Sequence, residues 1–90
     1  YITREDICVI IDRFYEKLYG QSMESEMNLE DEFSDYLDID EYAKNSVKHL
    51  RAAGIINGVG DGRFAPKENA ARSEVSKMTA LCFFKDEFNN

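Results

Sequence analysis

Two arginines stand at repeated positions near the starts of two predicted helices. Ile2-Thr3-Arg4-Glu5-Asp6 aligns with Ala70-Ala71-Arg72-Ser73-Glu74, 68 positions later, and in each copy arginine precedes an acidic residue by two. A guanidinium group offers a planar fork that matches a carboxylate, and a helix N-terminus adds unpaired N–H groups and a positive dipole end. Arg4 and Arg72 are therefore candidates for binding an anionic group, although either could instead pair with an acid of an adjacent helix. A unit that recurs in this way indicates one module of a repeat array.

A glycine-rich turn is the second candidate binding element. Three glycines fall within five residues at Gly58, Gly60 and Gly62, with Asp61 between the last two. Glycine adopts positive φ without steric cost, so this segment predicts a tight turn. Such a turn lets backbone amides approach a ligand closely, and all four residues are candidate ligand contacts. Glycines that serve only the turn are the simpler alternative.

Three amphipathic helices are predicted to hold these groups in place. Apolar residues recur with helical spacing over residues 3–19, 39–53 and about 71–84. Thr3 is a suitable N-cap, Asp38 or Asp40 is expected to cap the second helix, and Gly20 and Gly54 are suitable stops. Residues 21–37 show no sustained period and are rich in acids and serine, which indicates a solvated linker with at most a short helical turn. The predicted fold is all-α, with three main helices and a glycine-rich loop.

The predicted core follows from the helical stripes. Ile55, Ile56 and Phe64 are expected to enter it after the second helix. The stripe of the first helix comprises Ile7, Ile10, Ile11, Phe14, Tyr15 and Leu18, that of the second Tyr42, Ala43, Val47 and Leu50, and that of the third Val75, Met78, Leu81 and Cys82. Tyr42 is also a candidate ligand contact, because a tyrosine can stack on a sugar or hydrogen-bond to it.

Charge and composition exclude several classes of function. The 90 residues carry a net charge of −7: residues 1–43 have three basic and thirteen acidic side chains, whereas residues 44–77 have seven basic and three acidic ones. The acidic total argues against a nucleic-acid partner, and no apolar run approaches the roughly 18–20 residues that span a bilayer. The basic block remains able to bind a small anion, because salt screens the acidic segment beyond about 8–10 Å.

Cysteine and histidine give little indication of chemistry. Cys8 and Cys82 each lie in an apolar helical pattern and are not equivalent under the 68-residue offset. Buried thiols are the simplest interpretation, with a disulfide left open. There is no CxxC motif and the single histidine, His49, is expected on the surface near the end of the second helix, so no metal site and no cofactor is predicted. No nucleophile, base and oxyanion set can be assembled, so no catalytic residue is assigned.

Together these residues resemble the S-layer homology domain. The family pattern joins an aromatic helix, a glycine-rich segment of the type G-I-I-x-G-x-G-D-G-x-F-x-P, and an I-T-R-A-E signature that opens the next helix. In this chain the corresponding stretches are Phe33-Ser34-Asp35, Tyr42-Ala43, Ala52 to Pro66, and Ala70 to Glu74. The resemblance covers a full module from Phe33 to about Phe84. It implies three segments: residues 1–20 as the closing helix of a preceding module, 21–32 as an acidic linker, and 33–85 as one complete module.

The resemblance also implies a function. It suggests a non-catalytic anchor of an exported bacterial protein, located at the cell surface, that binds anionic and often pyruvylated secondary cell-wall polysaccharide. The signature arginines, Arg4 and Arg72, would hold the ligand's carboxylate in grooves between neighbouring modules. Neighbouring modules of the same family, or a second chain in a homodimer, are the expected protein partners.

Departures from the pattern leave two alternatives open. Ala70-Ala71 replaces Ile-Thr, Tyr42 replaces a tryptophan and Ser73 replaces an alanine, so a degenerate module kept for packing or self-assembly is one alternative. The other is calcium binding, because the loop from Asn57 to Glu68 resembles an EF-hand loop. In that interpretation Val59 occupies a position where an oxygen ligand is expected.

Overall fold

The computed structural model describes residues 2–20 and 28–83. It consists of α1 (Arg4–Tyr19), a short α2 (Leu29–Glu32), a 3₁₀ turn η1 (Tyr36–Asp38), α3 (Glu41–Ala52) and α4 (Arg72–Phe83). The described residues contain no strand, only one isolated bridge between Thr3 and Asn69. The all-α prediction with three main helices is thus confirmed. Most of the predicted acidic linker, and the expected extension of the last helix to Phe84, lie outside the described residues.

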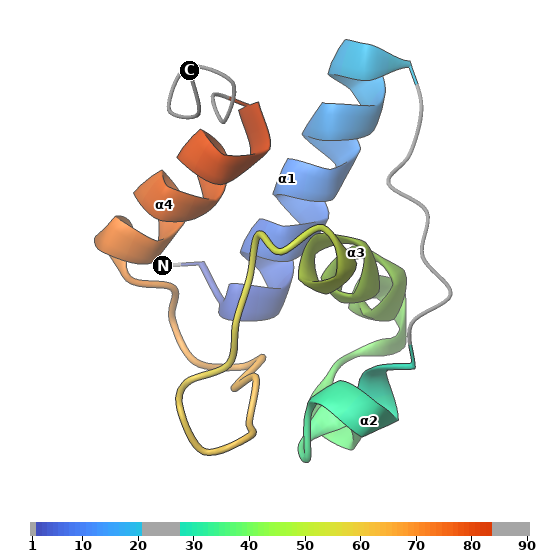
Figure 1. Ribbon diagram of the computed structural model, residues 1–90, viewed down its shortest axis with the longest axis vertical. Helices are drawn as coiled ribbons and strands as arrows, with labels where there is room; N and C mark the ends of the chain where they lie inside the picture. Colours follow the sequence, from blue (N-terminus) through green and yellow to red (C-terminus); the bar gives the residue numbers. More distant parts are fainter. Residues whose placement is uncertain (1, 21–27, 84–90) are drawn as a thin grey trace.

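The helix α1 is the central element of the fold. Both α3 and α4 pack against it, and a long segment leads from the end of α3 around the lower part of the molecule to α4 (Figure 1). Side chains from all three helices form one core with the loop residues Ile55, Ile56 and Phe64, as predicted. Phe33, beside α2, packs against Phe64 with ring centroids 5.2 Å apart. The glycine-rich loop is therefore attached to the core on both of its sides.

The ends of the helices follow their local sequence. The Thr3 side chain accepts a hydrogen bond from the Asp6 backbone N–H at 3.2 Å, which caps α1. Gly20 and Gly54 adopt left-handed φ angles of 73° and 77°, where glycine avoids the cost that other residues incur. Asp40 occupies the N-cap position of α3, but its side chain makes no capping bond and instead meets Lys67.

The predicted apolar stripes are only half correct. On α1, Ile7 and Ile11 are buried, whereas Ile10, Phe14 and Leu18 are each more than half exposed. The predicted stripe on α1 is wider than the surface that α3 and α4 cover. Its remaining residues are therefore exposed in the part of the chain that the structure describes. Tyr42, predicted on the buried stripe of α3, is 55% exposed, and Leu81 of α4 is 36% exposed.

A buried polar link joins α1 to α3. Asp12 is 7% exposed and accepts a hydrogen bond from the Ser46 hydroxyl at 3.0 Å. The His49 ring nitrogen Nδ1 lies 3.1 Å from the same carboxylate. The sequence suggested that His49 lies on the surface. Its side chain is instead half-buried against Asp12 of α1. A helix-packing role explains its position because a buried carboxylate needs polar partners.

The two cysteines are buried, as the sequence predicts. Cys8 and Cys82 are both buried and form no disulfide. Burial raises the pKa of the Cys8 thiol to about 12, so this side chain is protonated at neutral pH and behaves as a small apolar residue.

Among the described helices, none combines the length and the hydrophobicity that crossing a bilayer requires.

The start of α4 carries only half of a capping box, and completing it should stabilise the fold. Glu74 accepts a hydrogen bond from the Ala71 backbone N–H at 3.2 Å. Ala71 has no hydroxyl that could accept the reciprocal hydrogen bond from the Glu74 backbone N–H. We expect Ala71→Thr to raise the free energy of unfolding by about 1 kcal/mol in urea denaturation. Ala71→Val, of nearly the same shape, is the control and should not stabilise the chain. Equal effects of the two variants would show that the hydroxyl does not cap α4.

Candidate functional site

The Arg4 side chain is buried and fastens α1 to the glycine-rich loop. It is 7% exposed, and its Nε donates to the Phe64 carbonyl at 2.7 Å while Nη2 donates to the Asn57 carbonyl at 3.2 Å. The guanidinium carbon lies 5.1 Å from the centre of the Phe64 ring, within range of a cation–π contact. The third nitrogen, Nη1, forms an ion pair with Glu74 of α4. Arg4 therefore connects three separate parts of the chain.

The backbone at the start of α1 is also used within the protein. The Arg4 and Glu5 N–H groups donate to the carbonyls of Glu68 and Pro66 at 2.8 and 3.1 Å. The Asp6 N–H donates to the Thr3 side chain. These bonds occupy the N–H groups that a helix N-terminus would otherwise offer to an anion. Of the two features that made this helix start a candidate site, only the guanidinium remains.

A small pocket opens beside Arg4. Its volume is about 120 Å³, and its lining joins α1, the loop after α3, and α4 through Arg4, Ile55, Ile56, Asn57, Gly58, Glu74, Lys77 and Met78. The basic groups are Arg4 at the inner wall and Lys77, which is exposed. The acidic group is Glu74, already paired with Arg4. The pocket is thus a polar site assembled from both copies of the repeated signature.

The loop that forms one wall of the pocket leaves no space at Gly58. A Cβ atom placed there would lie 2.5 Å from the Arg63 carbonyl oxygen and 3.4 Å from a ring carbon of Phe33. The neighbouring Val59 N–H donates to the same carbonyl at 2.9 Å, which closes the turn. Gly60 and Gly62 have φ angles of 111° and 84°, a region that favours glycine. Each of these glycines has a structural reason to be present.

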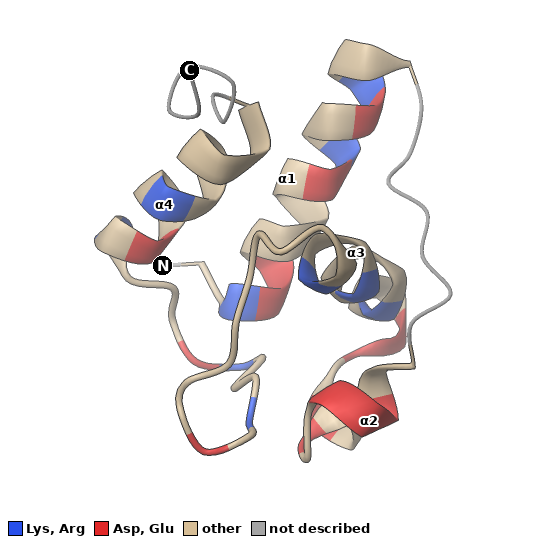
Figure 2. Ribbon diagram, viewed as in Figure 1, with Lys and Arg blue, Asp and Glu red and all other residues tan. Residues whose placement is uncertain are grey.

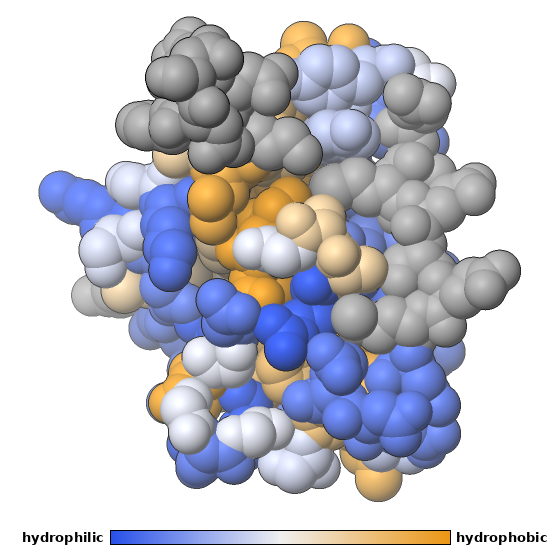
Figure 3. All heavy atoms as spheres, viewed as in Figure 1, coloured by the Kyte–Doolittle hydropathy of each residue, from blue (hydrophilic) through white to orange (hydrophobic). Residues whose placement is uncertain are grey.

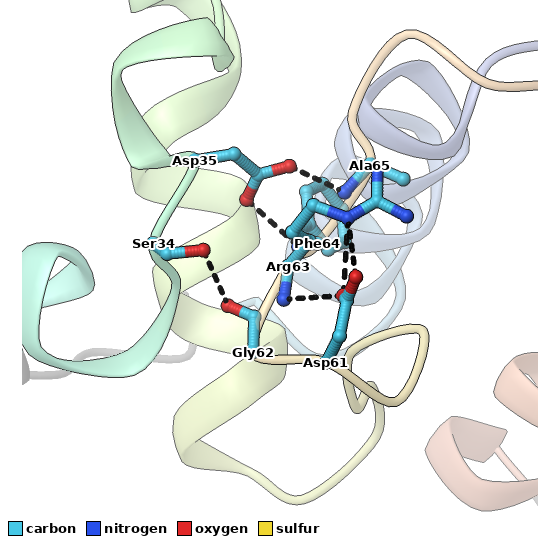
Figure 4. Close-up of polar contacts among 7 residues, drawn as sticks. All are labelled: Ser34, Asp35, Asp61, Gly62, Arg63, Phe64 and Ala65. Atoms are coloured by element: carbon cyan, nitrogen blue, oxygen red, sulfur yellow. Dashed lines mark hydrogen bonds and ion pairs between the residues drawn. The ribbon is translucent and has the colours of Figure 1, made fainter.

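Asp35 holds the far side of the loop, as Figure 4 shows. Its two carboxylate oxygens accept hydrogen bonds from the Phe64 and Ala65 backbone N–H groups at 2.8 and 2.9 Å. Ala65 has a φ of 59°, a left-handed conformation that is costly for a residue with a Cβ. The paired bonds from Asp35 offset that cost and fix the backbone just where Arg4 reaches the Phe64 carbonyl.

Glu5 forms a second polar centre at the start of α1, and neither it nor its partners line the pocket. It is 2% exposed, and it accepts bonds from the Asp40 N–H at 3.0 Å, the Lys67 ammonium at 2.7 Å and the Tyr42 hydroxyl at 3.3 Å. Lys67 also pairs with the Asp40 carboxylate at 2.6 Å. The Asp40 and Glu5 carboxylates raise the pKa of Lys67, and Lys67 in turn lowers the pKa of Asp40.

The structure brings together only part of the predicted site. Arg4 and Gly58 line the pocket. Tyr42 instead binds Asp6 and Glu5 through its hydroxyl, and the hydrogen bond to Asp6 raises the pKa of the phenol. Asp61 is exposed at the loop tip and pairs with Arg63, which lowers the pKa of that carboxyl (Figure 4).

The second signature arginine lies apart from the first. Arg72 is exposed at the start of α4 and does not line the pocket. Two residues later on the same helix, Glu74 does line it, as does Lys77. The sequence pattern identified Glu74 as the acid of the signature but did not place it opposite the arginine of the other copy. Helical spacing from Glu74 could have found Lys77, because residues three apart share a face.

Charge is unevenly spread over the elements. Acidic residues dominate the short α2, which carries Glu30, Asp31 and Glu32, while basic residues are visible on α3 and α4 (Figure 2). Arg51 of α3 links these regions through an ion pair with Glu32 at 3.0 Å and a hydrogen bond to the Asn57 side chain at 2.8 Å. The acidic segment is thus tied to the loop by a basic residue of α3.

The fold and this site define a small helical repeat module whose polar pocket is shared by two copies of one signature. Comparison with known families gives the particular class: residues 32–76 match the S-layer homology domain. The chain belongs to the S-layer homology domain family, whose members are cell-surface anchoring modules that bind cell-wall polymers. The resemblance inferred from the sequence is confirmed.

Several characterised proteins share this module. The chain is 40% identical over 77 residues to an amylopullulanase of Thermoanaerobacterium thermosulfurigenes, matching 86% of this chain and 4% of that protein. It is 31% identical over 87 residues to an endoglucanase of Bacillus sp. (strain KSM-635), matching 93% and 9%, and 40% identical over 77 residues to an exoglucanase, XynX, of Acetivibrio thermocellus, matching 86% and 7%. The chain therefore spans less than a tenth of each relative. No solved structure gives a significant match.

The close packing at Gly58 should make this position intolerant of any side chain. We expect Gly58→Ala to lower the free energy of unfolding by about 1–3 kcal/mol, because its Cβ would overlap the Arg63 carbonyl. Gly54→Ala is the control: it meets nothing within 4 Å and should cost about 1 kcal/mol through its left-handed φ alone. A Gly58→Ala chain as stable as the wild type in urea denaturation would contradict the packing described for this loop.

Proposed function

We propose that this module attaches an exported bacterial protein to anionic secondary cell-wall polysaccharide, and that it does so without catalysis. The observation that carries this proposal is the pocket that joins Arg4, the Asn57–Gly58 backbone and Lys77 in a member of a cell-surface anchoring family. In this proposal residues 1–20 act as the closing helix of a preceding module, residues 21–32 as the linker, and residues 33–85 as the complete module.

The size of the pocket limits what can enter it. Its volume of about 120 Å³ is below the roughly 300–1,000 Å³ of pockets that enclose whole ligands. It has room for an acidic substituent such as a carboxylate, with the sugar ring remaining outside. Pyruvyl ketals, which carry a carboxylate on a compact group, fit this limit. Lys77 on α4 would then supply the charge that meets the anion first.

Glu74 sets the condition for binding. Its carboxylate already pairs with Arg4 and also accepts the Ala71 N–H. An acidic substituent would therefore replace Glu74 at the guanidinium or bind beside the pair through Lys77. The second arrangement keeps the Arg4–Glu74 connection intact, and we favour it because Arg4 is fully engaged inside the protein. The direct ligand contacts are then Lys77 and the Asn57–Gly58 backbone, while Arg4, whose charge is balanced by Glu74, holds the pocket walls in place.

The packing alternative rests on the same contacts. Arg4 fixes three parts of the chain, and each loop glycine has a conformational or steric role, so a module kept for self-assembly would need the same residues. The calcium alternative has less support. The Asn57 side-chain oxygen accepts a bond from Arg51, the Asp61 carboxylate pairs with Arg63, and no group of three or more candidate ligands gathers within the described residues. Calorimetric titration with calcium, repeated on Asp61→Ala, distinguishes this alternative.

Retention on purified cell-wall sacculi tests the proposal. We expect Lys77→Gln to weaken retention by about tenfold, because a charge-assisted contact to the glycan is lost. Lys17→Gln is the control: it removes the same charge from the last turn of α1, away from the pocket, and should bind as the wild type does. Arg72→Gln, which removes an exposed charge outside the pocket, should have a smaller effect than Lys77→Gln.

Two results would contradict the proposal. Equal retention of the wild type and Lys77→Gln would remove the pocket from the mechanism. Retention of the wild type that is no stronger on native sacculi than on sacculi stripped of their secondary polysaccharide would leave the packing role alone. Circular dichroism of each variant confirms that the fold is kept.

A further inference from the structure

The loop after α3 contains the only asparagine–glycine pair of the sequence, Asn57–Gly58. The backbone nitrogen that follows an asparagine can attack the side-chain amide and close a five-membered ring, and a glycine has no side chain that would obstruct this attack. Both residues are exposed. In Figure 3 the hydrophobic atoms gather in the region between α1 and α4, and the lower part of the view, where this loop lies, is mainly hydrophilic. Water therefore has access to the pair.

The Gly58 nitrogen, which would attack, is not engaged by the rest of the fold. The next residue, Val59, donates its N–H to the Arg63 carbonyl at 2.9 Å. No hydrogen bond joins the Gly58 N–H to any other residue that the structure describes. Loss of the Gly58 amide proton therefore breaks no internal hydrogen bond, so the attack carries no cost of that kind.

Arg51 contacts the atom on which charge develops during such an attack. Its Nη1 donates to the Asn57 side-chain oxygen Oδ1 at 2.8 Å. When the nitrogen of Gly58 adds to the amide carbon, the electron pair of the carbon–oxygen double bond moves onto Oδ1. A guanidinium stays charged at neutral pH and stabilises this oxyanion in the manner of an oxyanion hole. The ion pair between Arg51 and Glu32 at 3.0 Å helps to hold the guanidinium in place.

We propose that Asn57–Gly58 is a site of spontaneous deamidation and that Arg51 accelerates the reaction. Hydroxide removes the Gly58 N–H proton, and the nitrogen bonds to the side-chain carbon of Asn57. The bond from that carbon to Nδ2 breaks, and ammonia leaves with a proton taken from water. Water then opens the resulting succinimide ring at either of its two carbonyls. The products are aspartate or isoaspartate at position 57, each with one new carboxylate.

An aspartate–glycine pair four positions later gives an internal comparison. Aspartate can close the same ring at Asp61–Gly62, but its ionised carboxylate is a poor electrophile. The Arg63 guanidinium pairs with Asp61 at 2.9 Å and lowers the pKa of that carboxyl, so the group stays ionised at neutral pH. We therefore expect the reaction at Asn57 to be the faster of the two.

The products change one wall of the polar pocket, which Asn57 and Gly58 line. In isoaspartate the main chain runs through the former side-chain carbon, so the backbone gains one carbon beside Gly58. A single Cβ on Gly58 would already lie 2.5 Å from the Arg63 carbonyl oxygen, so this loop has little room for a longer backbone. The former Asn57 carbonyl, which accepts a hydrogen bond from Arg4 at 3.2 Å, becomes a carboxylate. Aspartate leaves the backbone unchanged and places its charge beside Arg51.

Both products add negative charge to the pocket. If the pocket binds an anionic glycan, as the proposed function holds, deamidation weakens the attachment with time. The effect on attachment rests on the proposed function, whereas the deamidation itself does not.

Incubation of the whole chain in mildly alkaline buffer, followed by tandem mass spectrometry, tests the inference without any glycan. We expect conversion of the amide to an acid at Asn57, at least as fast in the folded chain as in the chain unfolded in urea. Arg51→Gln should slow the folded chain by about tenfold, because the donor to the oxyanion is lost. Asn57→Gln should abolish the conversion at this position, since its longer side chain forms the required ring far more slowly.

Two controls separate this role of Arg51 from its structural one. Glu32→Gln removes the ion pair to Arg51 but keeps the guanidinium, and it should deamidate within about twofold of the wild type. Arg63→Gln removes a loop guanidinium that pairs with Asp61 and should leave the rate at Asn57 unchanged. Circular dichroism of each variant confirms that the fold is kept.

Several results would overturn the inference. A folded chain that deamidates more slowly than the chain in urea would show that the fold protects the pair. A rate in Arg51→Gln that equals or exceeds that of the wild type would remove Arg51 from the reaction.

Retention of fresh and deamidated chain on sacculi is the second readout, and we expect the deamidated chain to bind more weakly. Equal retention of the two would contradict the effect on the pocket. Because the mass measurement needs no glycan, failure of the proposed function leaves the result on deamidation standing, and the reverse also holds.

Discussion

One buried guanidinium determines how the parts of this module fit together. Arg4 donates to two loop carbonyls, stacks on Phe64 and pairs with Glu74, so α1, the glycine-rich loop and α4 meet at a single side chain. Burial lowers the pKa of Arg4 from its ordinary value, but an arginine stays protonated at neutral pH even so. A buried charge of this kind is stable only when its donors are satisfied. The loop geometry, with Gly58 pressed against the Arg63 carbonyl and Asp35 holding Phe64, supplies those partners.

This arrangement explains why the signature of the family is repeated along the chain. Arg4 comes from the first signature helix, and Glu74 and Lys77 come from the second. The polar pocket therefore forms only where both helices contact the same glycine-rich loop. Both helices also leave apolar side chains exposed, among them Ile10 and Phe14 of α1 and Leu81 of α4.

Much of the fold could be predicted from the sequence, because it depends on local features. Helical spacing located α1, α3 and α4, and Thr3, Gly20 and Gly54 marked helix boundaries. The side of each helix that is buried could not be predicted in full. Ile10, Phe14 and Leu18 satisfy the apolar pattern equally well whether they face the core or a partner, and only tertiary packing distinguishes the two.

The candidate site was predictable to a smaller extent. The type and position of Arg4 indicated an anion-binding group, but its partners come from residues 53 to 70 positions away in the chain, which periodicity does not connect. Tyr42 illustrates the same limit: its place in an amphipathic stripe suggested burial or ligand contact, whereas its hydroxyl is held by Asp6 and Glu5. Pairings between distant elements were needed to assign these roles.

The central claim is that the fork of Arg4, and not its charge alone, holds the module together. Replacement of Arg4 by lysine tests this most directly, because lysine keeps the charge but lacks the planar fork that reaches both the Phe64 and Asn57 carbonyls. Urea denaturation of Arg4→Lys should show a loss of about 3 kcal/mol, the amount expected when one buried and one partly buried charge-assisted hydrogen bond are removed. A variant that unfolds at the same urea concentration as the wild type would contradict the account.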